Sequence, residues 1–502
     1  MATSPRLLLL IPLTAVGCVT PVDFGPDSMI GFADPEDAVA TVAETLTPFD
    51  ADRQDQAGPR QTTYGKTPEL VVSVQNHDLY VFAHDYGSTG GSGATAVGAK
   101  LLKLRRTEDD YIITRVIEPP GFLDRIVGMD HDPVDGTIYI ASAVAEGGVV
   151  DAEYPENDQY REGVVHVSAL TYDGEELFRT DLDVARAAAA ESPEQVINPM
   201  VAATGRLAVG GGHVALVHGI NTTPDPAIDN RRHQKALTTF LDADTGAVTR
   251  TSTIWVSHSF DQRLIWDGTG FVEHHLGDAY PRHIAFARTD PNASEAAKEF
   301  PLLFIKGESG ANVTDTSIGS VVPLPETDSA AFLAVYSTER NAAASSREIG
   351  VVRVMANFDQ VTTEGVEHLD TSLPDTMTTD LGEETPLRWL TDYQGESEGT
   401  LHADRPRMVD VGDGNYVVLW EKWSVSGDGG ADFEGTWGMV IDANGETLVD
   451  AKLIVPTHLP RGDDPFALPD GRAAWLTGDN ELKTLTIRSV DAELNYKAWT
   501  VE

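Results

Sequence analysis

Histidine, aspartate, tyrosine and arginine gather in one short stretch of the chain. Four of the fourteen His residues lie between His258 and His283, where an even distribution would place fewer than one. Imidazole and carboxylate groups hold metals or move protons, and Arg with Tyr binds carboxylate or sulfate groups. The candidate binding or catalytic residues are His258, Asp261, Arg263, His275, Asp278, Tyr280 and Arg282.

Three interpretations of this stretch stay open. Its side chains form a ligand or substrate site, or they hold a divalent metal, or they only tie strand ends together, with Arg282 paired to Asp278 or Asp261. The metal interpretation lacks the spacing of two His residues around a Glu on one helix face. We therefore expect no metal and no other cofactor.

An aromatic pair offers a different kind of contact. Trp420 and Trp423 flank Glu421, and indole rings stack on sugar rings. Alternation along a strand predicts that Trp420 faces the core and leaves Trp423 as the ligand-stacking candidate. The full phosphate-binding pattern that ends in Gly-Lys-Ser/Thr is missing, which counts against a nucleotide enzyme.

The first eighteen residues predict export. Arg6 precedes an apolar run from Leu7 to Gly17, which has the length of a signal-peptide core and is too short to cross a bilayer. The run ends in Ala15-Val16-Gly17-Cys18, which resembles a bacterial lipobox, and Cys18 is the only cysteine. The resemblance implies lipidation of Cys18 and a protein held at the bilayer by its lipid. We expect a cell-envelope location, in the outer membrane if the cell has two membranes.

The composition describes a folded, strongly acidic protein. Lys and Arg number 36 against 79 Asp and Glu, a formal charge of −43, while 41% of the 502 residues are apolar. That apolar share is enough for a large core. The excess of negative charge repels nucleic acid phosphates, so we expect no nucleic acid partner.

Beyond residue 62 the chain repeats a hairpin of two apolar strands joined by a tight turn. Turns that contain Asp-Gly or Asn-Gly tolerate positive φ and set the register of the strands. A second strand–turn–strand pair follows each copy. The seven first hairpins turn at residues 76–78, 133–136, 210–212, 267–270, 327–328, 412–415 and 469–471.

Seven units of four strands predict an all-β fold, a seven-bladed β-propeller of four-stranded antiparallel blades. The repeat resembles the Trp-Asp and kelch propellers, although their signatures are missing, since Trp266-Asp267 occurs once and without a Gly-His partner. No named enzyme family matches. Two tandem β-sandwiches remain the alternative.

The chain divides into three expected parts. Residues 1–17 are the signal peptide, 18–62 a lipid-anchored and largely irregular tether, and 63–502 the propeller. Within the tether, an apolar piece at 38–46 is a candidate helix or packs on the main domain. The expected blades span residues 63–118, 124–182, 200–256, 259–306, 315–369, 404–456 and 463–502.

Long connections are expected on one face of the propeller. The turns between strands one and two and between strands three and four are tight, whereas the links between strands two and three are long. Binding residues concentrate in the loops of rigid scaffolds. The long links are residues 83–99, 141–163, 219–235, 337–347 and 421–436.

These features predict an extracytoplasmic, lipid-anchored propeller that binds a partner protein, a glycan or a small anionic ligand on its long-loop face. Two alternatives stay open. The first is a hydrolase or lyase acting on an extracellular polymer, with His258 or His275 as general acid/base, Asp278 orienting it and Arg282 holding an acidic group. The second is a structural surface lipoprotein.

Overall fold

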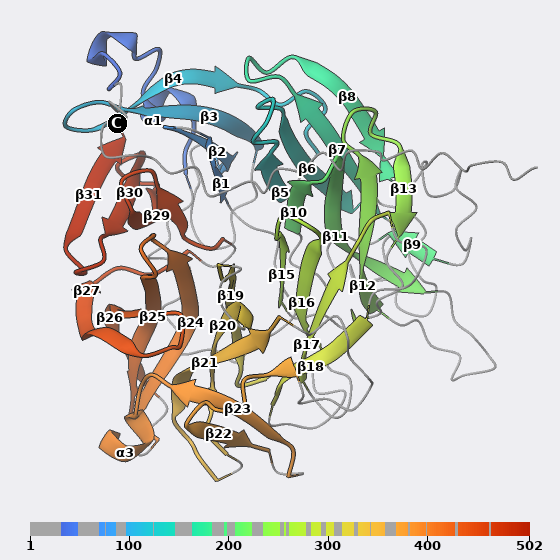
Figure 1. Cartoon of the computed structure of the whole chain (residues 1–502). Helices are drawn as coiled ribbons and strands as arrows, with labels where there is room; N and C mark the ends of the chain where they lie inside the picture. Colours follow the sequence, from blue (N-terminus) through green and yellow to red (C-terminus); the bar gives the residue numbers. More distant parts are fainter. Residues whose placement is uncertain are drawn as a thin grey trace, which may run out of the picture. The chain divides into compact units, whose positions relative to one another are not determined.

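The computed structural model describes most of the chain beyond residue 31 (Figure 1). The segments described are residues 32–48, 70–75, 77–86, 97–123, 125–145, 163–182, 195–197, 206–222, 234–251, 256–257, 261–277, 283–292, 298–305, 314–325, 330–341, 343–356, 368–379, 382–397, 399–426, 430–460 and 463–501. The lipobox with Cys18 lies outside them, as do His258, Asp278, Tyr280 and Arg282.

The fold is the predicted seven-bladed β-propeller of four-stranded antiparallel blades. Each of the first four blades is built from consecutive strands, ordered from the centre outward. Their strands are β1 (Leu70–Gln75), β2 (Asp78–Asp85), β3 (Gly98–Arg106) and β4 (Tyr111–Ile117) in blade 1; β5 (Arg125–His131), β6 (Ile138–Ala145), β7 (Gly163–Leu170) and β8 (Glu176–Asp181) in blade 2; β10 (Arg206–Gly210), β11 (His213–Thr222), β12 (Gln234–Asp242) and β13 (Val248–Thr251) in blade 3; β15 (Asp261–Trp266), β16 (Phe271–Leu276), β17 (His283–Thr289) and β18 (Lys298–Phe304) in blade 4.

Blades 5 to 7 follow the same plan with one irregularity. Their strands are β19 (Ser317–Pro323), β20 (Ala330–Glu339), β21 (Arg347–Met355) and β23 (Glu384–Trp389) in blade 5; β24 (Leu401–Asp410), β25 (Tyr416–Val425), β26 (Ala431–Ile441) and β27 (Thr447–Val455) in blade 6; β28 (Phe466–Leu468), β29 (Arg472–Asp479), β30 (Thr484–Val490) and β31 (Tyr496–Val501) in blade 7. Short strands β9 (Gln195–Ile197) and β14 (Val256–Ser257) extend blade 3, and β22 (Asp375–Thr378) pairs with β23.

Blade 5 differs from the sequence-based expectation in its outer strand. We expected blade 5 to lie within residues 315–369, and residues 357–367 of that span lie outside the described residues. Beyond the expected end of the blade, β23 pairs with β21 through Gly350 with Trp389 and Val351 with Arg388. A bridge between Val354 and Leu369 also pairs the outer side of β21.

The seven innermost strands form a closed ring. Each contacts the next in chain order, and β28 of the last blade contacts β1 of the first. Seven separate apolar clusters fill the seven joints between neighbouring blades. Since no blade mixes strands from the two ends of the described chain, side-chain packing rather than strand exchange closes the ring.

Side chains also link neighbouring blades at the centre. An innermost strand is an edge strand, and its inward backbone groups need partners. Asp463 Oδ2 accepts a hydrogen bond from Val72 N at 3.0 Å across the joint between blades 7 and 1. Asp130 Oδ2 accepts one from Val209 N at 2.9 Å between blades 2 and 3. Acidic side chains thus join the blades as well as facing the channel.

Residues 32–48 pack against the propeller where the ring closes. The 3-10 helix η1 (Pro35–Asp37) contacts β4, and helix α1 (Val42–Thr45) begins with a capping box between Thr41 and Glu44. Val42 and Leu46 are buried in the cluster that joins blades 1 and 7. This part of the expected tether therefore covers the closing joint.

No helix in the described part of the chain is long and apolar enough to span a bilayer.

Candidate functional site

Two of the candidate residues, Asp261 and Arg263, lie on β15, the innermost strand of blade 4. A third, His275, lies on the neighbouring strand β16 and pairs in register with Gln262. The remaining four candidates of this stretch lie outside the described residues. The structure therefore tests the expected cluster in part only.

His275 is buried between blades 3 and 4. Its side chain is 2% exposed, and its Nε2 lies 3.3 Å from Glu273 Oε2, which also accepts a hydrogen bond from Thr238 Oγ1 of blade 3 at 2.6 Å. His274 points to the other joint, where its ring contacts Tyr336 of blade 5, and burial lowers its pKa well below the usual value. Neither ring lines the central cavity described below.

Trp423 is also covered by protein, in contrast to our expectation of a ring free to stack on a ligand. It is 2% exposed, and its ring packs against Phe433 and His458 with centroids 5.2 and 5.6 Å away. A shift in register between Lys422 and Trp423 interrupts the strand pairing there. Simple alternation along β25 therefore does not predict the exposure of this residue.

A cluster of charged groups gathers where the innermost strands begin. Arg263 is its centre, with Nη1 2.8 Å from Asp261 Oδ1 and Nε 2.8 Å from Asp464 Oδ2. Arg407 Nε of blade 6 lies 3.3 Å from the other oxygen of Asp464. Arg206 Nη2 of blade 3 lies 3.6 Å from Asp261 Oδ1. Three guanidinium groups from three blades thus meet two carboxylates.

Burial and neighbouring charges shift the pKa values of this cluster in opposite directions. Burial raises the pKa of Asp463, next in the chain to Asp464, to about 7. Burial also opposes ionisation of Asp464, but Arg263 and Arg407 outweigh it and hold the pKa of Asp464 below its usual value. Burial and the charge of Arg263 lower the pKa of Arg206, yet a guanidinium remains charged at every ordinary pH.

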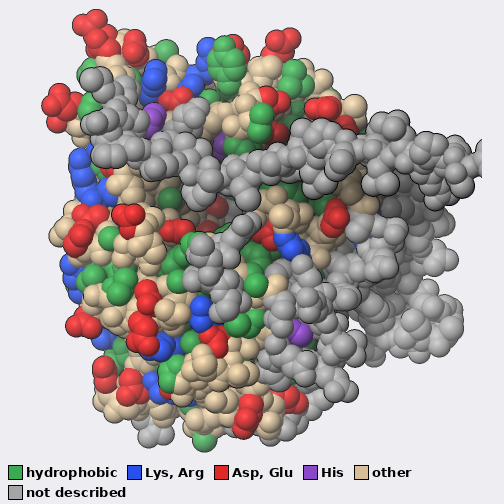
Figure 2. Space-filling model, viewed as in Figure 1, with side chains coloured by type: hydrophobic (Ala, Val, Ile, Leu, Met, Phe, Trp, Pro, Cys, Tyr) green, Lys and Arg blue, Asp and Glu red, His purple; other side chains and the backbone are tan. Residues whose placement is uncertain are grey.

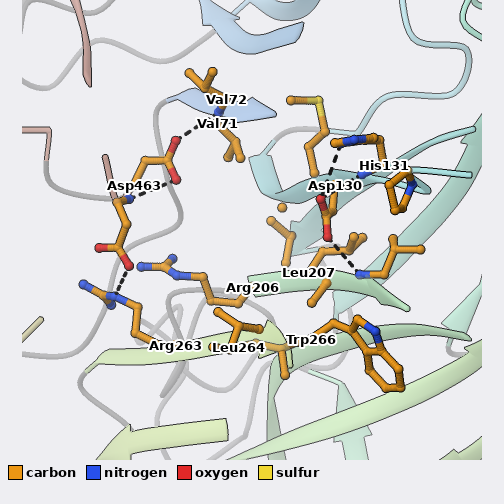
Figure 3. Close-up of a pocket in the computed structure, with 18 residues that line it drawn as sticks. Val71, Val72, Asp130, His131, Arg206, Leu207, Arg263, Leu264, Trp266 and Asp463 are labelled. Carbon is orange, nitrogen blue, oxygen red and sulfur yellow. Dashed lines mark hydrogen bonds and ion pairs between the residues drawn. The ribbon is translucent and has the colours of Figure 1, made fainter. Parts of the chain in front are cut away.

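Beside this cluster lies a cavity of about 390 Å³ in the central channel (Figure 3). Figure 3 shows the side chains of Arg206 and Arg263 at one end, near Asp463, and Asp130 with His131 at the other. Burial raises the pKa of Asp130 to about 6. The apolar side chains of the wall belong to four blades: Val71, Val127, Leu207, Leu264 and Trp266. The cavity therefore joins apolar walls to an end lined by two arginines and two aspartates, Arg206, Arg263, Asp463 and Asp464.

Sequence analysis found Asp261 and Arg263 but missed Arg206, Arg407 and Asp464. A signal was present, because an Arg followed by two apolar residues lies on the innermost strand in four of the seven units. These tripeptides start at Arg125, Arg206, Arg263 and Arg407. Asp464, the carboxylate that pairs with Arg263 and Arg407, could not be recognised from the sequence, because it precedes a strand of only three residues.

Two further chemical possibilities find little support in the described residues. No three His, Cys, Asp or Glu side chains among them lie close enough together to hold a metal ion. The sequence does contain a Gly-x-Ser-x-Gly pattern at residues 395–399. Its serine lies at the end of helix α3 (Tyr393–Ser397), whereas a nucleophile elbow places the serine in the turn before a helix.

Comparisons with known proteins find distant resemblance to solved structures and no family match. No family model and no curated protein matches the chain. Solved structures that resemble it include a subtype N10 neuraminidase-like protein of A/little yellow-shouldered bat/Guatemala, with 9% identity, TM-score 0.35, and coverage of 73% of this chain and 94% of that one. Two quinohemoprotein alcohol dehydrogenases also resemble it. The one from Pseudomonas putida HK5 has 10% identity, TM-score 0.37 and coverage of 93% and 74%; the one from Comamonas testosteroni has 9%, 0.39, and 91% and 71%.

Proposed function

We propose that the protein binds a small carboxylate ligand with an apolar body in its central channel. The observation that carries the proposal is the convergence of Arg206 and Arg263 at one end of an apolar-walled cavity, with Arg407 behind Asp464. Guanidinium groups bind carboxylates through paired, charge-assisted hydrogen bonds. The ligand carboxylate lies at this cluster and its apolar body along the channel wall.

The local charge supports an anion even though the whole chain is acidic. Asp and Glu side chains are spread over the face of the molecule in Figure 2, and the formal charge is −43. Salt limits the reach of such surface charges to about 8 Å at physiological ionic strength. The charged cluster, which we call the channel mouth, holds three arginines (Arg206, Arg263 and Arg407) against the carboxylates of Asp261 and Asp464. Asp463 beside them becomes neutral below about pH 7. The mouth is therefore cationic in mildly acidic solution.

The apolar walls predict how affinity depends on the ligand. Val71, Val127, Leu207 and Leu264 offer hydrocarbon surface beside the arginines. Each added methylene that enters this space contributes up to about 0.8 kcal/mol, or about fourfold in affinity. Short hydrophilic anions should bind weakly, and medium-length carboxylates more tightly.

Calorimetric titration of the full chain with acetate, butanoate and hexanoate at pH 6 tests this proposal. We expect affinity to rise along the series and to fall about tenfold for hexanoate in Arg206→Gln, because a charge-assisted hydrogen bond is lost. Arg206→Lys keeps the charge and should retain part of the affinity. Arg105→Gln is the matched control, since Arg105 is a half-exposed arginine paired with Asp78 on blade 1.

Affinity that is flat along the series, or unchanged in Arg206→Gln, would contradict the proposal. So would equal affinity at pH 6 and pH 8, because Asp463 should lose its proton between these values and make the mouth less cationic. Arg206→Gln must first show a cooperative unfolding transition, which establishes that the variant is folded. If it does not, Arg206→Lys and the comparison of pH 6 with pH 8 still test the carboxylate proposal.

Binding is better supported than catalysis by the described residues. The enzyme alternative needs a histidine that reaches a substrate, and His275 faces Glu273 in a buried joint. His258 lies outside the described residues. The guanidinium cluster, in contrast, adjoins open space.

We further propose that the protein is anchored in the cell envelope through lipid on Cys18. The support is the apolar run and the lipobox-like Ala15-Val16-Gly17-Cys18 of the sequence. A single acyl chain gives marginal binding and two or more give stable anchoring. Labelled palmitate should enter the wild-type chain and not Cys18→Ser; equal labelling of both would refute the anchor.

A further inference from the structure

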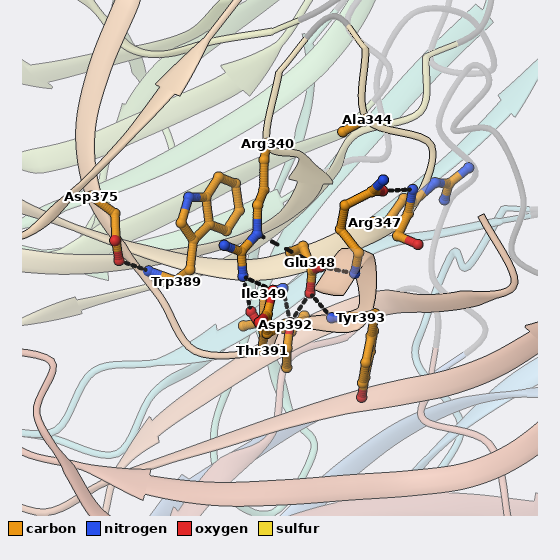
Figure 4. A network of polar contacts seen from close by, with 12 residues as sticks. Arg340, Ala344, Arg347, Glu348, Ile349, Asp375, Trp389, Thr391, Asp392 and Tyr393 are labelled. Atoms are coloured by element: carbon orange, nitrogen blue, oxygen red, sulfur yellow. Dashed lines mark hydrogen bonds and ion pairs between the residues drawn. The ribbon is translucent and has the colours of Figure 1, made fainter. Parts of the chain in front are cut away.

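A second cavity, of about 570 Å³, lies between blades 5 and 6, away from the channel. Its residues come from the segment after β20, from β22 and β23, from the following link and helix α3, and from blade 6. Figure 4 shows the blade 5 part, with Arg340 beside Trp389 and the segment from Thr391 to Tyr393 around Glu348. Nothing in the proposed channel function uses this cavity.

The cavity lies where the outer strand of blade 5 diverges from its sheet. In blades 1 and 7, the third and fourth strands pair over six residue positions, whereas β21 and β23 pair over two. Beyond those two positions, β23 pairs with β22. The outer side of β21 also forms a bridge between Val354 and Leu369.

Hydrogen bonds of Glu348 and Arg340 fix the part of the cavity wall that residues 391–394 form. Glu348 is fully buried and accepts hydrogen bonds from Thr391 Oγ1 at 2.6 Å, Tyr393 N at 2.9 Å and Gln394 N at 2.7 Å. Arg340 Nη2 donates to Thr391 O at 2.5 Å and lies 3.0 Å from Asp392 Oδ1. A wall held by several buried bonds is preorganised for a ligand.

Aromatic side chains dominate the rest of the lining. Three of the eight tryptophans of the chain, Trp389, Trp420 and Trp437, line this one cavity. Trp420 is buried and donates through Nε1 to Tyr393 Oη at 2.9 Å, while the other two are half-buried. Lys422 Nζ lies 4.5 Å from the ring centre of Trp437, and the Arg340 guanidinium lies 5.3 Å from that of Trp389. A positively charged side chain thus lies over one face of each of these two rings.

Charged groups of both signs surround the rings, two cations and three carboxylates. Arg340 and Lys422 provide donors, and Asp375, Asp392 and Glu396 provide acceptors. The carboxylates disfavour an anionic ligand and the cations disfavour a cationic one. Hydroxyl groups both donate and accept, so a neutral polyhydroxylated ring satisfies both kinds of group. The apolar face of such a ring packs on half-exposed indole.

We infer that the cavity between blades 5 and 6 is a glycan-binding site for neutral sugars. Its recognition elements are the rings of Trp389 and Trp437 together with donors and acceptors at their edges. The proposal is independent of the carboxylate site, because the two cavities share no residue.

Saturation-transfer NMR on the full chain tests the inference. The probes are cellobiose, lactose, mannobiose and diacetylchitobiose, with glucuronate as the charged comparison. We expect transfer to at least one neutral disaccharide and less to glucuronate. Trp389→Ala should weaken that binding about tenfold, because a stacking ring is removed. Trp266→Ala is the matched control, since it removes a half-buried tryptophan of the channel cavity.

The outcomes separate the alternatives. No transfer to any neutral sugar would overturn the inference, as would binding that survives Trp389→Ala and is lost in Trp266→Ala. If Trp389→Ala does not fold, Lys422→Met takes its place, since Lys422 lines the cavity beside the ring of Trp437. Sugar binding without carboxylate binding, or the reverse, would refute one proposal and leave the other standing.

Discussion

The two cavities of this propeller are built in opposite ways. The channel mouth gathers buried charges from residues as distant as Arg206 and Asp464, and the ion pairs of Asp261 and Asp464 with arginines also join different blades. The cavity between blades 5 and 6 draws on two neighbouring blades and on half-exposed rings. Substitutions at the mouth should therefore cost stability, whereas those in the outer cavity should mainly change binding.

The largest effect is expected for Asp464→Ala. Arg263 and Arg407 have side chains only 3% exposed and both lie against Asp464, so its loss leaves two buried guanidinium groups short of a partner. Breaking a buried ion pair from one side costs about 3–5 kcal/mol. Urea unfolding monitored by tryptophan fluorescence measures this loss.

Asp463→Asn is the control for that comparison. The carboxyl of Asp463 has a pKa of about 7 and accepts a backbone hydrogen bond from Val72, which an amide oxygen also accepts. We expect a loss below about 1 kcal/mol at pH 6, since one neutral acceptor replaces another. Similar losses in both variants would show that position, and not charge pairing, matters at the mouth.

Glu348→Gln should have an intermediate effect. It keeps one acceptor oxygen but weakens the bonds that hold Thr391, Tyr393 and Gln394. Loss of charge-assisted hydrogen bonds costs about 2 kcal/mol here. Hydrogen exchange should rise in α3 and stay unchanged in β15. An equal rise in hydrogen exchange in α3 and β15 would contradict the claim that Glu348 acts only on the cavity between blades 5 and 6.

The smallest effect is the pH dependence that Asp463 adds to stability. Its folded pKa of about 7 is above the unfolded value near 4, so the folded state holds the proton more tightly. The stabilisation is full below about pH 4 and is lost as the pH rises through about 7. Relative to Asp463→Asn, the wild type should lose about 1 kcal/mol between pH 6 and pH 7. If the difference in unfolding free energy between the wild type and Asp463→Asn did not change with pH, the raised pKa of Asp463 would be contradicted.

The fold could be predicted because its signals are local. Tight turns followed by apolar strands repeat seven times, four of them with Asp-Gly, and a glycine such as Gly136 takes the φ of 78° that its turn requires. Each blade is one continuous stretch of chain, so local hairpins determine the whole topology. The outer strand of blade 5 was not predicted because a long stretch of chain separates β23 from β21. No local sequence feature distinguishes β23 from a connecting segment.

The candidate site was predicted in part. The concentration of His, Asp, Tyr and Arg in one stretch pointed to blade 4, and Arg263 does lie at the channel mouth. Asp464 and Arg407, which complete the cluster, come from other blades. Which side chains meet across the ring depends on how seven units are arranged around the axis, which no short sequence window contains. His275 has a reactive side chain, but its position on the second strand places it in a buried joint.

A crystal structure of the full chain with 6-bromohexanoate at pH 6 tests the carboxylate proposal most directly. We predict an anomalous bromine peak in the channel beside Val71, Val127 and Leu207, with the carboxylate within hydrogen-bonding distance of Arg206 or Arg263. A peak in the cavity between blades 5 and 6, or a channel without bromine, would contradict the account.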